Sequence, residues 1–318
     1  MTATPRPGIA WTAPPEVAIR AFDFDDTPLF PVIARRAPPD AAIPTHNPAM
    51  TPIYGIDFTS SPRKAKPITV ARGRLAKNVF ELEGIESLPD WAQFEAFLIR
   101  PGPWVGGFDF PFGLPREAVI DLGWPLQWKK LTAHCASLGR ERFRNALDAW
   151  RAPRPVGNKY AHRATDIPAR SHSPLKLVNP PVGLMFLEGA SRLAAAGLGV
   201  PGIVTGDESR IALEAYPGLA ARAITRESYK SDEKAKQTPA RRKVRAEMVS
   251  VLARDGGPFG FTLSGDCKLL ASLTRDASGD RLDAVLAAML AAWGWKRRSR
   301  NYGLPGDVDP LEGWIVMA

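Results

Sequence analysis

Four acidic residues stand in apolar surroundings that give a charge no evident structural use. Asp57, Asp109 and Glu214 each end a short apolar run, and Asp283 precedes another. An ionised carboxylate in an apolar layer is costly unless something pairs with it. Clustered carboxylates also repel one another, and hard divalent cations such as Mg²⁺ or Mn²⁺ relieve that repulsion. Because such ions activate water for phosphodiester cleavage, the four acids predict a metal-dependent hydrolytic site.

Each acid also has a structural explanation when it is considered alone. Asp57 and Asp109 could each bond to the backbone of the turn that follows it. Glu214 could pair with Arg210 or with Arg222. The occurrence of four such acids in one chain favours a shared site over four separate explanations.

Asp280 and Asp283 lie three residues apart on a helix expected over residues 280–295, where apolar residues recur at helical spacing. Residues at i and i+3 are neighbours on one helix face. An Asp at the start of a helix also caps it or complements its dipole, which explains Asp280 well. Asp283 lies inside the helix and is therefore the stronger candidate. We predict Asp283 as a catalytic residue and both acids as metal ligands.

The composition is that of a soluble globular protein. The 318 residues include 45% hydrophobic and 24% charged types, with a formal net charge of +9 that favours a polyanionic partner. Two cysteines form no disulfide framework, which fits a reducing cytoplasm. No apolar run approaches the roughly 20 residues of a membrane helix, and we expect no membrane partner.

The chain divides into two parts by composition. Residues 1–50 are rich in proline and predict a poorly ordered N-terminal arm. Residues 51–318 predict one α/β domain, in which residues 116–200 form an insertion of helices and loops. Strands are expected at residues 53–59, 68–73, 78–84, 104–110, 209–216 and 313–317.

Four motifs, in this order and spacing, resemble an uncharacterised bacterial family of predicted nucleases with the RNase H-like fold. They are Tyr54-Gly55-Ile56-Asp57-Phe58-Thr59, Gly107-Phe108-Asp109-Phe110-Pro111-Phe112-Gly113-Leu114-Pro115, Leu213-Glu214-Ala215-Tyr216-Pro217 and Gly279-Asp280-Arg281-Leu282-Asp283-Ala284. The resemblance covers residues 53–318. It implies a mixed five-stranded sheet, its first three strands antiparallel, flanked by helices. It also implies an acidic centre built from Asp57, Asp109, Glu214 and Asp283, with Asp280 beside it and Mg²⁺ or Mn²⁺ as the cofactor.

Basic residues supply the second part of a nuclease hypothesis. Five of them are candidates for contacts with nucleic-acid phosphates: Lys159, Arg163, Lys230, Arg241 and Arg242. The alternative is that they form a solvated charged surface.

Three functions remain open from the sequence. The first is a metal-dependent nuclease that hydrolyses phosphodiester bonds of DNA or RNA. The second is a protein of the same fold that binds nucleic acid or acts as a scaffold without catalysis. The third is an actin-like or sugar-kinase-like phosphotransferase, whose opening strand also reads Gly-Ile-Asp. That class requires a duplicated half with glycine-rich phosphate loops, and the sequence has no internal repeat.

Overall fold

The computed structural model of the chain describes residues 51–318. The predicted N-terminal arm, residues 1–50, lies outside the described residues. None of the helices between residues 51 and 318 combines the length and the apolar character needed to cross a membrane.

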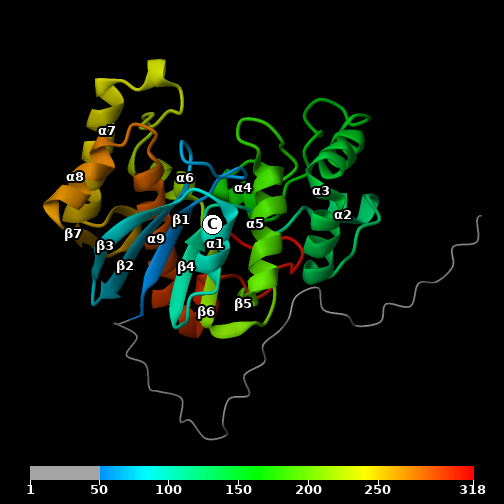
Figure 1. The fold of residues 1–318 in the computed structure, drawn as a ribbon, viewed down its shortest axis with the longest axis horizontal. Coiled ribbons are helices and arrows are strands. Elements are labelled where there is room, and N and C mark those ends of the chain that lie inside the picture. Colours follow the sequence, from blue (N-terminus) through cyan, green and yellow to red (C-terminus); the bar gives the residue numbers. More distant parts are fainter. Residues whose placement is uncertain (1–50) are drawn as a thin grey trace, which may run out of the picture. The chain divides into compact units, whose positions relative to one another are not determined.

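A seven-stranded mixed sheet forms the centre of the described chain (Figure 1). Its strand order is β5-β6-β4-β1-β2-β3-β7. β1, β2 and β3 pair in antiparallel fashion, whereas β4 is parallel to β1 and β6 is parallel to β4. The strands are β1 (Ile53–Asp57), β2 (Ile68–Ala76), β3 (Val79–Leu88), β4 (Trp104–Phe108), β5 (Leu198–Gly199), β6 (Asp207–Glu214) and β7 (Thr262–Gly265).

The predicted mixed sheet with three antiparallel strands at its start is confirmed, but the predicted count of five strands is wrong. The two further strands, β5 and β7, lie at the two edges of the sheet and are too short to give an alternating pattern. The strand expected at residues 313–317 is reduced to a single bridge between Glu214 and Ile315.

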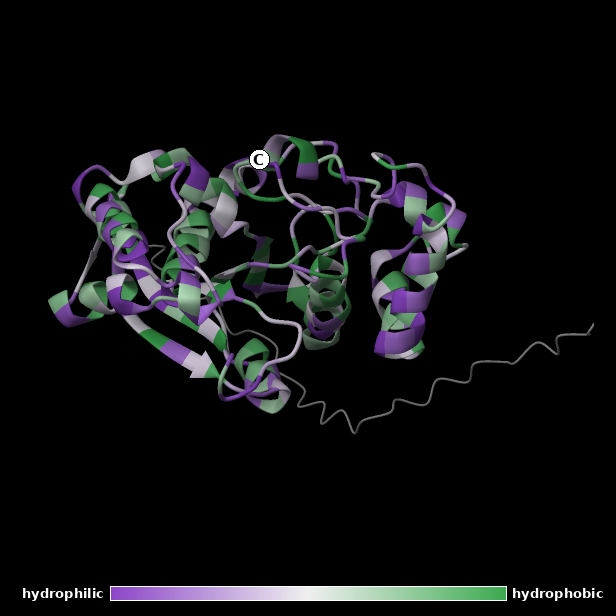
Figure 2. Ribbon diagram, turned by 90° about the horizontal axis from the view of Figure 1, so that it is seen from above, coloured by the Kyte–Doolittle hydropathy of each residue, from purple (hydrophilic) through white to green (hydrophobic). Residues whose placement is uncertain are grey.

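Helices cover both faces of this sheet and bury a separate apolar core on each (Figure 1). α1, α2, α3 and α5 contribute to one core, and α6 to α9 contribute to the other. Most of these helices mix hydrophobic and hydrophilic residues (Figure 2). The α-helices are α1 (Trp91–Leu98), α2 (Arg116–Asp121), α3 (Trp128–Arg151), α4 (Asp166–Ala169), α5 (Val182–Ala196), α6 (Pro217–Ile224), α7 (Pro239–Arg254), α8 (Cys267–Arg275) and α9 (Asp280–Lys296), and the short 3-10 helices are η2 (Lys234–Lys236), η3 (Gly257–Phe259) and η4 (Arg298–Gly303).

α9 packs unusually close to the middle of the sheet. A Cβ atom on Gly55 of β1 would collide with the backbone of Ala284 and Ala288, and one on Gly107 of β4 would collide with Ala287. The small side chains of α9 allow this approach, and its alanines are fully buried. The close packing brings the first turn of α9, which carries two acids, to the sheet beside the end of β1.

Candidate active site

Asp57 and Asp109 stand next to each other at one edge of the sheet. β1 and β4 are parallel neighbours in which Ile56 is paired with Phe108, and the Asp109 amide donates a hydrogen bond of 2.9 Å to the Ile56 carbonyl. Side chains alternate along a strand, so both acids project to the face that α9 covers. Both line a cavity of about 400 Å³.

The two carboxylates are uncompensated. Neither of them accepts a hydrogen bond from any residue between 51 and 318. Burial raises the pKa of Asp57 well above its usual range, and repulsion from Asp283 and Asp280 raises it further. Burial also raises the pKa of Asp109 to about 7, and Lys230 offsets only part of that rise. The positive charge of Lys230 therefore offsets only part of the burial and repulsion at this pair.

Asp283 is fully buried beside this pair and is held by two residues from the loop that precedes α7. The Tyr229 hydroxyl donates to Asp283 Oδ1 at 2.5 Å, and the Lys230 ammonium pairs with Asp283 Oδ2. Burial disfavours the charged ammonium, but the attraction of Asp283 outweighs this and raises the pKa of Lys230. Lys230, which is predicted as a nucleic-acid contact, lines the cavity with its ammonium paired to Asp283.

Asp280 is engaged by a second lysine. Lys66 Nζ lies 2.9 Å from Asp280 Oδ1 and 2.8 Å from Asp232 Oδ1. Lys66 and Asp280 both line the cavity that contains Asp57. Lys66 and Tyr229 were not identified from the sequence, because each comes from an irregular segment with no periodic pattern.

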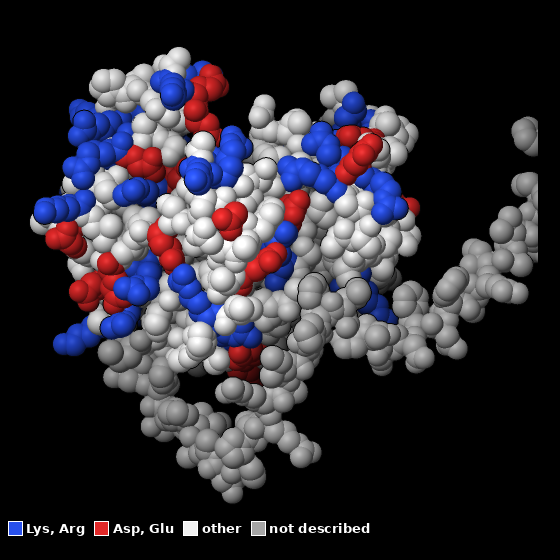
Figure 3. Space-filling model, in the orientation of Figure 1, with Lys and Arg blue, Asp and Glu red and all other residues white. Residues whose placement is uncertain are grey.

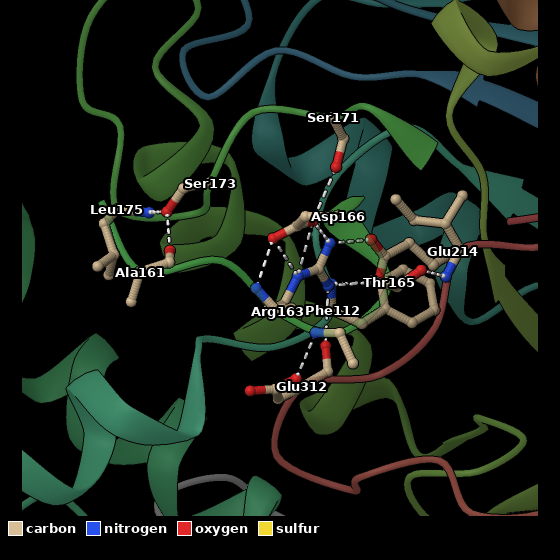
Figure 4. A network of polar contacts seen from close by, with 12 residues as sticks. Phe112, Ala161, Arg163, Thr165, Asp166, Ser171, Ser173, Leu175, Glu214 and Glu312 are labelled. Atoms are coloured by element: carbon tan, nitrogen blue, oxygen red, sulfur yellow. Dashed lines mark hydrogen bonds and ion pairs between the residues drawn. The ribbon is translucent and has the colours of Figure 1, made fainter. Parts of the chain in front are cut away.

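Glu214 belongs to a different cluster (Figure 4). Its two oxygens accept hydrogen bonds from Arg163 at 2.7 and 2.9 Å, and one also accepts the Phe112 amide at 2.9 Å. Arg163 further pairs with Asp166 at 2.9 Å. The side chains of Arg163, Asp166 and Glu214 are 2%, 0% and 3% exposed. Burial raises the pKa of Glu214, although Arg163 acts in the opposite direction.

The register of β6 explains why Glu214 does not join Asp57. Glu214 is paired with Phe108 and Leu213 is paired with Gly107. Glu214 therefore shares the sheet face of Phe108, whereas Asp57 and Asp109 project to the opposite face. Glu214, which is predicted to belong to the acidic centre, is therefore held by Arg163 and not beside Asp57, although its charge still acts on Asp109. The prediction that Arg163 contacts nucleic acid is wrong, because its guanidinium is buried and paired.

The five predicted ligands do not form one metal site. Among residues 51–318, no group of three or more His, Cys, Asp or Glu side chains is arranged to hold a metal ion. Asp57 and Asp109 nevertheless fit a magnesium ion by their chemistry, because both are free of hydrogen bonds and offer hard oxygen donors. Mg²⁺ commonly binds through one or two carboxylates and completes its shell with water and substrate phosphates.

The remaining predicted contacts lie at the surface. Lys159 and Arg242 are exposed, and Arg241 is half-buried with a hydrogen bond of 2.7 Å to the Lys236 carbonyl. Figure 3 shows lysines and arginines gathered with interspersed acids over the side of the molecule that carries α7 and α8.

Chemically, the arrangement offers a cavity with two uncommitted carboxylates and two ammonium groups, a combination suited to a cation and an anionic substrate. No protein-family model matches the chain, and no curated protein or solved structure is detectably similar to it.

Proposed function

We propose that the protein is a metal-dependent phosphodiesterase acting on nucleic acid, with Asp57 and Asp109 as ligands of a divalent cation. The observation that carries the proposal is the pair of unpaired carboxylates at the ends of two parallel neighbouring strands. Burial raises the pKa of both groups, and a bound divalent cation would favour their ionised forms.

The sheet supports the same proposal. β1, β2 and β3 are antiparallel, β4 and β6 continue the sheet in parallel, and α9 packs on the sheet with acids in its first turn. This is the arrangement that the resemblance to nucleases of the RNase H-like fold implies, with β5 and β7 as additions at the edges.

The other residues of the cluster have roles that follow from their contacts. When bound, a divalent cation would lower the pKa of water and stabilise negative charge on the phosphate. Asp283 fixes Lys230 and Tyr229 beside the two ligands. Lys230 lines the cavity with part of its side chain exposed, so its ammonium is positioned to donate to a phosphate oxygen.

Surface charge supports a polyanionic substrate. The chain carries a net charge of +9, and basic residues of α7 gather on one side of the molecule (Figure 3). Such a surface attracts phosphate backbones in a salt-dependent way.

The proposal is tested by incubating the purified protein with single- and double-stranded DNA and RNA in the presence of Mg²⁺ or Mn²⁺. We expect cleavage of at least one substrate, loss of cleavage with chelator, and loss of cleavage in Asp57→Asn. Asp148→Asn, which changes an exposed acid on α3, is the matched control and should cleave normally. Equal rates for the wild type and Asp57→Asn on every substrate would contradict the proposal.

A further inference from the structure

A second cavity, of about 380 Å³, adjoins the candidate active site. Four residues line both cavities: Asp109, Pro180, Met185 and Lys230. Its volume lies within the range of about 300–1,000 Å³ that is usual for small-molecule sites. A ligand in this cavity would therefore reach Asp109 of the carboxylate pair.

One wall of the second cavity combines an aromatic ring with two guanidinium groups. Tyr216 precedes α6, and Arg222 lies 5.2 Å from the centre of its ring. Arg222 also donates to the Tyr216 hydroxyl at 3.3 Å and to the Ala169 carbonyl, so its orientation is fixed. Arg226 is exposed, and its guanidinium has no hydrogen-bond or ion-pair partner within the described chain.

Pro180, Val182 and Met185 add apolar side chains to the lining of the cavity. Arg163 and Glu214 also line it but neutralise each other. Lys230 is paired with Asp283, which lies outside the cavity lining, and the remaining charged side chains are Arg222, Arg226, Asp109 and Glu227. Two guanidinium groups beside an apolar and aromatic surface suit a ligand that joins an anionic group to a flat ring.

We propose that this cavity binds one unpaired nucleotide of the substrate, with its base against Tyr216 and the apolar wall and its phosphate toward Lys230. The inference rests on the proposed function and adds the substrate class. Bases stack on tyrosine rings and on arginine planes in single-stranded complexes. A base inside a duplex cannot enter such a cavity without leaving its stack, so the enzyme selects single-stranded or frayed nucleic acid.

The cavity is tested by titrating the four ribonucleoside and four deoxyribonucleoside 5′-monophosphates into the full chain by calorimetry, in the presence of chelator. Val182→Trp fills this cavity and leaves the first one untouched, because Val182 lines only the second among the residues of the two cavities. We expect Val182→Trp to weaken binding at least about tenfold by steric exclusion. Arg226→Gln removes one charged donor and should weaken binding about fivefold.

Two controls make the test decisive. Lys130→Gln removes an exposed charge on α3, away from both cavity linings, and should bind like the wild type. Ribose 5-phosphate lacks the base and should bind much more weakly than the nucleotides. Because Arg226 is exposed and unpaired, its variant keeps the test valid even if Val182→Trp folds poorly.

The outcomes separate the two proposals. Absence of mononucleotide binding, equal binding by Arg226→Gln and the wild type, or equal binding of ribose 5-phosphate would overturn the cavity assignment. Cleavage of duplexes as fast as of single strands would overturn it as well. Mononucleotide binding that is intact in Asp57→Asn, in a protein that cleaves nothing, would support the cavity and contradict the proposed function.

Discussion

Three adjacent parallel strands each have a carboxylate at their end, but the hydrogen bonding of these carboxylates differs. Glu214, at the end of β6, has both oxygens saturated by Arg163 and Phe112. Asp57 and Asp109, at the ends of β1 and β4, accept no hydrogen bond from the described residues. The same position in a strand therefore serves a structural cluster in one case and a candidate active site in the other.

The Arg163 cluster, which comprises Arg163, Asp166 and Glu214, has a structural role. Arg163 comes from the loop between α3 and α4, Glu214 comes from the sheet, and the Glu312 carbonyl, from the C-terminal segment, accepts a further hydrogen bond of 2.8 Å from Arg163. Three distant parts of the chain are joined at one buried cation. A buried ion pair of this kind is strongly destabilising to break, because one charge is then left without compensation.

The Asp57 cluster, which comprises Asp57, Asp109, Asp283 and Lys230, contains negative charges that repel one another. Repulsion among Asp57, Asp109 and Asp283 works against folding, and Lys230 offsets it in part. Titratable groups with shifted pKa values in a cavity are typical of functional sites, where residues that bind a ligand can lower the stability of the fold. The comparison predicts that substitutions in the Asp57 cluster change cleavage, whereas substitutions in the Arg163 cluster change the free energy of unfolding.

The largest expected effect is that of Asp57→Asn on cleavage. Loss of a supporting partner of a metal ligand costs about 10–100-fold in affinity or activity, so loss of a ligand should lower the cleavage rate at least about 100-fold. The free energy of unfolding should not fall, because a repelled charge is removed. A variant that loses stability but keeps its cleavage rate would reverse the assignment of the two clusters.

Glu214→Gln should produce the opposite pattern. It leaves the buried Arg163 with one carboxylate in place of two, and we expect the free energy of unfolding to fall by about 3 kcal/mol, measured by urea denaturation. Lys243→Gln at an exposed pair is the control, with a change within about 0.5 kcal/mol. Unchanged stability in Glu214→Gln would show that the Arg163 cluster is not structural.

Gly55→Ala tests how the Asp57 cluster is positioned. The added methyl group would collide with the backbone of α9 at Ala284 and Ala288, and such overpacking costs about 1–3 kcal/mol. Gly84→Ala in β3 is the matched control, since a Cβ there meets no atom within 4 Å. Equal stability of the two variants would mean that the close packing of α9 does not determine the position of the Asp57 cluster.

The acidic pair also predicts a pH dependence of stability in chelator. The pKa of Asp109 is raised to about 7 in the folded protein, against about 3.9 in an unfolded chain. The folded state therefore binds more protons between these values, and stability falls as the pH rises from about 4 to 7. Asp109→Asn should be more stable than the wild type at pH 8, and the difference should vanish near pH 4. A difference that grows toward acid pH would contradict the assigned shift.

Much of the fold could be predicted from apolar patterning. β1 is an apolar run that ends in Asp57, β4 is an apolar run followed by Asp109, and the apolar second half of β6 ends in Glu214. α9 shows apolar residues at helical spacing. β5 and β7 have two and four residues, too few to reveal a period.

The site was predicted in part. The adjacency of Asp57 and Asp109 follows from two parallel strands of similar sequence. The face occupied by Glu214 depends on the register of β6 against β4, and a shift of one residue would reverse it. That register is set by tertiary packing, as are the loops that bring Lys66 and Tyr229 to the acids.

The central claim is that the Asp57 cluster, and not the Arg163 cluster, accepts a divalent cation. Calorimetric titration of Mn²⁺ into the wild type, Asp57→Asn and Glu214→Gln, each at a temperature where it is folded, tests this claim most directly. We predict that the wild type and Glu214→Gln bind the ion and that Asp57→Asn does not. Binding to Asp57→Asn with the wild-type affinity would contradict the claim.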